Sequence, residues 1–129
     1  MKKWLVLLLL LCSGTVFSAS LPAPAAVVYK GEAGQPPVQV ALAYLKDKIS
    51  NPAGQFEYQG LDIKQRSQGE DFSHTKLSVE MKGLMDDSVA SERYRFKMAV
   101  VDSVWVITAE QKDQRCRRGI KGYTQKLCP

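Results

Sequence analysis

Residues 73–76, Ser-His-Thr-Lys, bring together the side chains of this chain that come closest to a catalytic set. Ser73 and Lys76 have the Ser-x-x-Lys spacing of a serine nucleophile. That chemistry needs the serine at a helix N-terminus and partner motifs of the types Ser-Asp-Asn and Lys-Thr-Gly. The chain contains neither partner motif, and its match lies in a segment with the alternating pattern of a strand. We interpret the match as a coincidence.

His74 is the only histidine and therefore the first candidate for a general base. A catalytic triad would need it beside a serine and an acid, and Asp71, Ser73 and Ser78 are near in sequence. Adjacent positions of a strand face opposite ways, so we expect His74 to be exposed on a polar face with Ser78. The sequence thus predicts no catalytic residue and no cofactor.

Two acidic pairs, Glu70-Asp71 and Asp86-Asp87, are the candidates for a cation site. Calcium takes six to eight oxygens from well-spaced ligands, and neither pair has the spacing of a calcium loop. We interpret both pairs as solvated turn charges and predict no metal site. Glycine loops of the phosphate-binding kinds are also absent from the sequence.

The end of the chain concentrates positive charge. Residues 112–129 have a net charge of +5, while residues 21–111 have a net charge of −2. Arginine can bind phosphate or carboxylate through two parallel hydrogen bonds, so the tail is a candidate anion-binding segment. The alternative is a solvated basic end that keeps the protein soluble. The candidate residues are Arg115, Arg117, Arg118, Lys121 and Lys126.

The first twenty residues predict export. Lys2 and Lys3 precede an apolar run at residues 4–11, and small residues follow at 18–20, which is the pattern of a secretory signal peptide. The apolar run is far shorter than the roughly 20 residues that span a bilayer, so we predict no transmembrane segment. We favour cleavage after Ser20 over cleavage after Ser18. The predicted location is the periplasm or the extracellular space.

Cys12 gives a second interpretation of the same segment, a lipoprotein signal in which this cysteine is lipidated. Leu11 stands before it, where a small residue would be expected, so we favour cleavage. Cleavage removes Cys12 and leaves two cysteines, Cys116 and Cys128, which most simply pair in an oxidising compartment. Closing that short loop would stabilise the fold by about 3 kcal/mol.

The remaining chain reads as a leader, one helix and four strands. Residues 21–35 are rich in Ala, Pro and Gly and predict a flexible leader, with residues 27–29 as a candidate short strand. Pro36-Pro37 predicts the start of a helix with one apolar stripe up to Ile49, and Pro52 predicts its end. The period then changes to two, which predicts strands near residues 56–63, 75–81, 94–100 and 104–109. We expect a polar loop at 83–92, a tight connection at Asp102-Ser103 and an irregular tail from Gln111.

This order predicts an α+β fold, in which one N-terminal helix packs on a four-stranded antiparallel meander. Over residues 36–111 the order resembles the cystatin-like and NTF2-like group, which implies a curved sheet around the helix. We divide the chain into a signal peptide (1–20), a leader (21–35) and one domain (36–129) with a disulfide loop at 116–128. The tail, with Trp105 before it, also resembles small exported bacterial proteins of unknown function.

These observations favour a small, non-enzymatic binding or accessory protein of the bacterial cell envelope. Its partner would be an anionic envelope component or an acidic protein, with no specific recognition of nucleic acid. Binding would use the open face of the sheet, the loop at 83–92 or the basic tail. Two alternatives stay open: a secreted inhibitor of a hydrolase that uses the disulfide loop as a rigid insert, and an NTF2-like enzyme that uses His74 and an acid.

Overall fold

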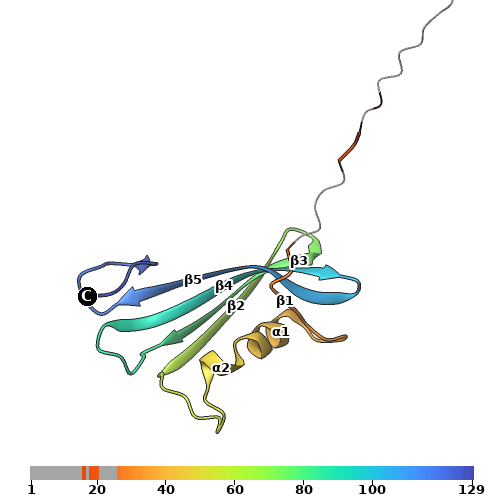
Figure 1. Ribbon diagram of the computed structural model, residues 1–129. Coiled ribbons are helices and arrows are strands. Elements are labelled where there is room, and N and C mark those ends of the chain that lie inside the picture. The colour runs from red at the N-terminus through yellow and green to blue at the C-terminus, as the bar shows by residue number, and fades with distance from the viewer. Residues whose placement is uncertain (1–15, 17, 21–25) are drawn as a thin grey trace, which may run out of the picture.

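The described part of the chain forms one twisted antiparallel sheet with two short helices against one of its faces (Figure 1). The computed structural model describes residues 16, 18–20 and 26–129. The predicted signal peptide, including Cys12, lies largely outside the described residues and stays a prediction. We call the face that carries the helices the inner face, and the opposite face the outer face.

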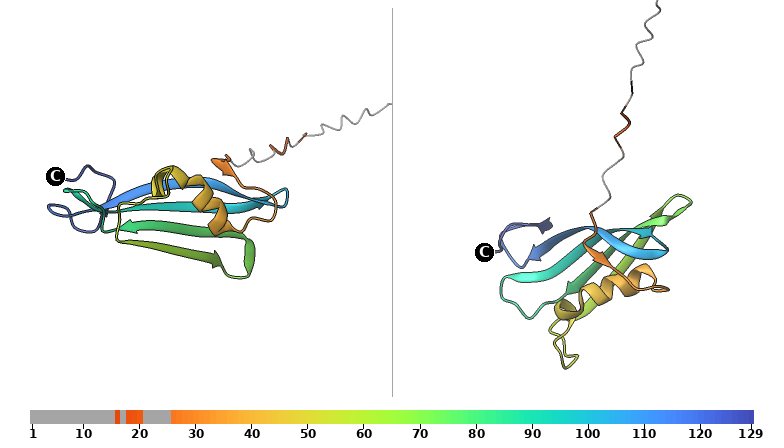
Figure 2. Two further views of the ribbon diagram at one scale, coloured as in Figure 1. Left: turned by 90° about the horizontal axis from the view of Figure 1, so that it is seen from below. Right: turned by 45° about the vertical axis from the view of Figure 1, so that its right-hand side comes forward.

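Eight elements make up the fold. In chain order they are β1 (Tyr29–Lys30), α1 (Pro37–Tyr44), α2 (Lys46–Ile49), β2 (Gly60–Gln68), β3 (Asp71–Lys82), β4 (Val89–Val101), β5 (Val104–Cys116) and β6 (Tyr123–Thr124). The strand order across the sheet is β1-β5-β4-β3-β2, and β6 pairs with the far end of β5. Figure 2 shows the helices lying across the long strands on one side only.

The helix start and the last hairpin turn were predicted correctly. Pro36 is the N-cap of α1 and Pro37 its first residue, where proline's missing N–H has no helical partner anyway. Asp102 and Ser103 join β4 to β5, and both have positive φ, 50° and 65°. Two successive residues with positive φ form the turn that matches the twist of a two-residue hairpin.

The predicted fold class was wrong. The described residues form six strands and two short helices, and not one helix on a four-stranded meander. The expected helix is interrupted at Leu45, whose ψ of 5° is outside the helical range. In the leader, β1 overlaps the short strand considered at residues 27–29, whereas β6 in the tail was missed. A two-residue strand depends on its partner, here β5, and therefore leaves no periodic pattern of its own.

Strand boundaries were misplaced where the sheet is polar on both faces. The first predicted strand included Phe56 and Tyr58, but β2 begins at Gly60 and continues past Ile63 through polar residues to Gln68. β5 was expected to end near Ala109 but continues to Cys116. In both stretches the backbone pairs with a neighbouring strand, so pairing and not an apolar face holds them in place.

The core lies between the helices and the inner face. Side chains from α1, β3, β4 and β5 fill it, and Tyr44 stacks edge-on against Phe96. Burial of such apolar side chains contributes about 25 cal/mol for each Å² removed from water. The buried core residues are Val40, Ala41, Leu45, Leu77, Val79, Met81, Tyr94, Phe96, Met98 and Ile107. Because residues of a strand alternate between faces, this packing sends the intervening polar residues to the outer face.

Candidate functional site

Side chains of the outer face form three rows that cross the sheet from β2 to β5. We name the rows by their charge. The acidic row is Asp62, Glu80, Arg93 and Asp113. The first basic row is Lys64, Ser78, Arg95 and Gln111. The second basic row is Arg66, Lys76, Lys97 and Ala109.

The two basic rows line a groove of about 620 Å³. It is open to solvent and continues into a neighbouring hollow of about 420 Å³ that shares three of its cations. We call its five cationic residues the basic groove: Lys64, Arg66, Lys76, Arg95 and Lys97. Within the described part of the chain, only Arg95 of these five has a carboxylate oxygen within 4 Å.

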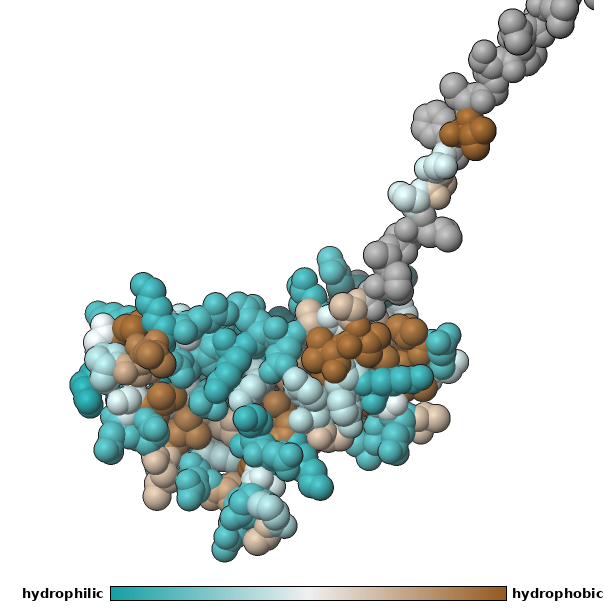
Figure 3. Space-filling view, in the orientation of Figure 1, coloured by the Kyte–Doolittle hydropathy of each residue, from teal (hydrophilic) through white to brown (hydrophobic). Residues whose placement is uncertain are grey.

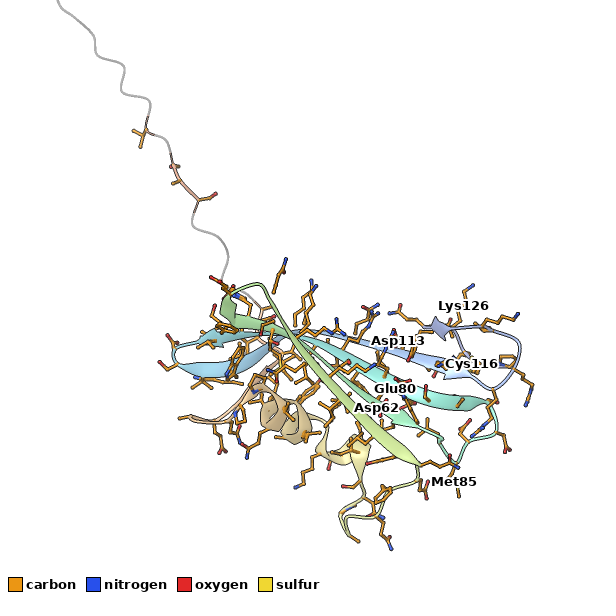
Figure 4. All side chains as sticks on the ribbon, turned by 180° about the vertical axis from the view of Figure 1, so that it is seen from behind. Asp62, Glu80, Met85, Asp113, Cys116 and Lys126 are labelled. Carbon is orange, nitrogen blue, oxygen red and sulfur yellow. A yellow bond between two sulfur atoms is a disulfide. The ribbon has the colours of Figure 1, made fainter. Side chains whose placement is uncertain are left out.

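Hydrophilic residues cover much of the surface over the long strands, and apolar residues gather toward both ends, with the larger group near the N-terminal trace (Figure 3). Figure 4 shows three carboxylates of the acidic row, Asp62, Glu80 and Asp113, following one another across the sheet. The outer face is therefore divided along its strands. Carboxylates gather in one row, while the next two rows carry cations.

Asp113 is the most completely neutralised carboxylate of the acidic row. Arg93 donates two parallel hydrogen bonds of 2.8 Å to its two oxygens, and Arg95 lies 3.0 Å away. The hydrogen bonds from Arg93 lower the pKa of Asp113, and the same contact raises the pKa of Arg93. The Asp113 side chain is only 6% exposed, so these contacts are partly shielded from water.

Glu80 is buried and is held by hydroxyl groups. Ser91 donates a 2.9 Å hydrogen bond to one of its oxygens, and the Tyr123 hydroxyl lies 2.9 Å from both. The Arg93 guanidinium sits 3.4 Å from the centre of the Tyr123 ring, a cation–π contact. Burial, followed by the hydrogen bond to Glu80, raises the pKa of Tyr123. Tyr123 thus fastens the tail to the outer face.

Asp62, at the β2 end of the acidic row, forms an exposed ion pair with Lys82. The hydrogen bond from Lys82 lowers the pKa of Asp62, and the same bond raises the pKa of Lys82. Each carboxylate of the acidic row therefore has a partner within the protein. Asp62 and Asp113 are paired with cations, while the partners of Glu80 are hydroxyl groups that do not offset its charge.

The disulfide between Cys116 and Cys128 is present as predicted and closes the tail. The arginines of the predicted anion-binding segment contact the protein itself. Arg117 donates hydrogen bonds to the backbone carbonyls of Leu84 and Asp86. Arg118 donates one of 3.4 Å to the backbone carbonyl of Asp87. Arg115 stands 5.4 Å from the centre of the Tyr123 ring.

Two further residues of that segment, Lys121 and Lys126, are exposed at the surface. Anion binding by the tail remains a prediction. The two hydrogen bonds of Arg117 connect the disulfide loop to the loop between β3 and β4.

His74 belongs to a hydrogen-bonded turn at the start of β3. The Ser73 hydroxyl is 3.0 Å and an Asp71 oxygen 2.8 Å from the same ring nitrogen, Nδ1. A catalytic triad needs the serine on one nitrogen and the acid on the other, so this cluster cannot relay a proton between them. Hydrogen bonds from Ser73, followed by one from His74, lower the pKa of Asp71.

Asp86 of the second acidic pair accepts hydrogen bonds from the backbone N–H groups of Ser88 and Val89, at 2.8 and 2.7 Å. These bonds lower the pKa of Asp86 and shape the loop before β4. Across residues 16, 18–20 and 26–129, no group of three or more His, Cys, Asp or Glu side chains is placed to hold a metal ion.

A larger cleft of about 750 Å³ lies on the helix side, between α2, the loop at 50–58 and residues 84–86. Its lining mixes carboxylates with apolar side chains, including the exposed Phe56 and Met85. Its charged residues are four carboxylates and Lys48. Glu92 is paired with Lys112, and Asp86 accepts backbone hydrogen bonds.

No protein-family model, curated protein or solved structure matches this chain. None of the helices in the described segments has the length and apolar character needed to cross a membrane. The interpretation of the basic groove therefore depends on its own geometry and charge.

Sequence reasoning missed the basic groove, although its residues gave a signal. Arg95 and Lys97 were assigned to the polar positions of a strand, but their neighbours across the sheet could not be known without the register. A second short alternation, Lys64-x-Arg66, lay beyond the end of the strand predicted at 56–63. Alternating cations on separate strands are the pattern that could have pointed to this face.

Proposed function

We propose that this protein is a small, exported, non-enzymatic binding protein of the bacterial cell envelope that captures an anionic ligand in the basic groove. The signal-like residues 1–20 support export, and the charged face supports the chemistry of the ligand. Lysine and arginine donate charge-assisted hydrogen bonds to phosphate and carboxylate groups, which are abundant in envelope polymers and head groups.

One observation carries the proposal. Arg66, Lys76 and Lys97 stand directly opposite one another on three adjacent strands. Like charges in such cross-strand positions destabilise a sheet. No carboxylate of the described residues lies within 4 Å of these three to relieve the repulsion. A bound anion would remove that cost.

Binding, not turnover, fits the residue types of the groove. Its lining combines five cations with the neutral Ser78, Ala109 and Gln111, and its one carboxylate, Glu110, accepts a hydrogen bond from Tyr44. General-base catalysis needs a group whose pKa lies near the working pH. The groove cations are exposed lysines and arginines, residue types that hold an anion by charge and hydrogen bonds.

Three charge-matched variants test the proposal. The groove variant is Lys76→Gln plus Lys97→Gln, the tail variant is Lys121→Gln plus Lys126→Gln, and the helix variant is Lys46→Gln plus Lys48→Gln. Each removes two exposed lysines. We expect the groove variant to elute from immobilised phosphate at clearly lower salt than the wild type, because screened contacts to the ligand are lost.

The helix variant controls for the loss of two charges anywhere on the surface. Elution of the groove variant together with the helix variant would contradict the proposal, because net charge alone would then explain retention. A larger shift in the tail variant would move the site to the tail.

A further inference from the structure

The cations of the basic groove are packed into a small, two-dimensional block. Residues two apart on a strand are separated by about 7 Å, and neighbouring strands by about 4.8 Å. The backbone positions of all five cations therefore fall within roughly 7 by 10 Å on β2, β3 and β4. A ligand that engages all five must carry several negative charges close together.

Carboxylates border this block at both ends of the strands. On one side, the acidic row contains Glu80, whose hydroxyl partners do not offset its charge. On the other side, Glu70 lies in the turn between β2 and β3, and Asp71 is the first residue of β3. An extended polyanion lying along the strands would leave the cations and meet carboxylates in either direction. Like-charge repulsion disfavours that path.

A polyanion crossing the strands would also use the groove poorly. On β5 the two basic rows end in Ala109 and Gln111, which are uncharged. A single linear chain that follows the second basic row would contact three cations and leave Lys64 and Arg95 of the first row unused. A ligand that contacts both basic rows must carry its negative charges in a compact cluster and not along a linear chain.

From these limits we infer that the basic groove takes a compact polyphosphate group, two or three linked phosphates, and not an extended polyanionic chain. This inference rests on the proposed function of the groove and names its ligand class. Small side chains at Ser78 and Ala109 leave room above the strands for such a group. Arg66 and Arg95 can each donate two parallel hydrogen bonds to phosphate oxygens, while the lysines act as point charges.

Arg95 connects the groove to the acidic row. It lies 3.0 Å from Asp113 and is 43% exposed, so it can turn toward a ligand. Asp113 keeps its two hydrogen bonds from Arg93 when Arg95 moves. A phosphate can therefore recruit Arg95 without leaving a buried carboxylate unpaired.

Titration calorimetry of the purified protein with inorganic triphosphate, orthophosphate and polyglutamate tests the ligand class. We expect triphosphate to bind about tenfold or more tightly than orthophosphate, because added phosphates reach both rows. The groove variant, Lys76→Gln plus Lys97→Gln, should lose about tenfold or more of that affinity. The helix variant, Lys46→Gln plus Lys48→Gln, should bind triphosphate like the wild type.

The results with the three anions distinguish a failure of this inference from a failure of the proposed function. Groove-dependent binding of polyglutamate that is tighter than that of triphosphate would overturn the compact ligand and leave the anion-binding groove in place. Binding of none of the three anions would overturn both. Neutral phospholipid vesicles, with and without a lipid carrying a diphosphate head group, identify the source. Competition with triphosphate by the diphosphate vesicles alone supports a lipid source, and its absence supports a soluble one.

Discussion

Asp113 offers the sharpest test at the scale of a single residue. Arg93 lowers the pKa of Asp113 in the folded protein, so ionised Asp113 stabilises the fold above its unfolded pKa of about 3.9. That contribution is lost as the pH falls through the lowered folded pKa. We expect Asp113→Asn to lower the free energy of unfolding by about 2–3 kcal/mol at pH 7. Urea denaturation at pH 7 and below pH 4 should show the difference shrinking in acid.

Asp62→Asn is the matched control, since it also removes a carboxylate of the acidic row that is paired with a cation. The Asp62 side chain is 43% exposed, against 6% for Asp113, and solvent weakens exposed ion pairs. Its effect at pH 7 should be clearly smaller. Equal losses from the two variants, or a loss at Asp113 that does not depend on pH, would refute the role given to the Arg93 contact.

Single residues also explain what the sequence could and could not predict about the candidate site. Residues 21–111 have a net charge of −2, which directed attention to the basic tail. The net charge of a segment does not show which face of the sheet each charged side chain occupies. Alternation along the strands sends Arg95 and Lys97 to one face, and only the register shows that Lys76 stands between them and β2. The cations of the basic groove therefore lie in a segment whose net charge is negative.

At the scale of elements, the tail is held by the disulfide and by the contacts of Tyr123 with Glu80 and Arg93, and we expect the pairing of β6 to depend on the disulfide. β6 is only two residues long, and such a short pairing is not stable by itself. We expect Cys116→Ser plus Cys128→Ser to lower the free energy of unfolding by about 3 kcal/mol, from the closure of the loop between them. Hydrogen exchange at the Thr124 amide should also become faster, as measured by NMR.

Val79, buried in β3, provides the internal reference for that measurement, because its amide should stay protected in both proteins. Unchanged exchange at Thr124 would mean that the Tyr123 contacts to Glu80 and Arg93 hold the tail without the disulfide. In that case the assigned dependence would be wrong.

The elements also show which strand boundaries the pattern of hydrophobic residues could predict. Alternation located the middles of β3 and β4, where one face is buried in the core. It failed for the end of β2 and for the second half of β5, which are polar on both faces and are held by backbone pairing. The helix was predicted to start at Pro36-Pro37 but was not predicted to break at Leu45, a buried apolar residue that fits either form.

For the whole molecule, the division of the outer face into acidic and basic rows implies a conflict between stability and binding. Lys76 and Lys97 face each other across β3 and β4, with Arg66 on the far side of Lys76. The groove variant removes this repulsion and keeps most of the length of both side chains. We therefore expect it to raise the free energy of unfolding by about half a kcal/mol while it weakens anion binding.

Urea denaturation at low and high salt measures this effect. The gain should be larger at low ionic strength, because salt screens repulsion between exposed charges. Lys46 and Lys48 lie two residues apart on α2, where side chains do not face each other, so the helix variant should show no such gain. A groove variant less stable than the wild type at low salt would mean that the lysines support the sheet. Their presence would then need no anion to explain it.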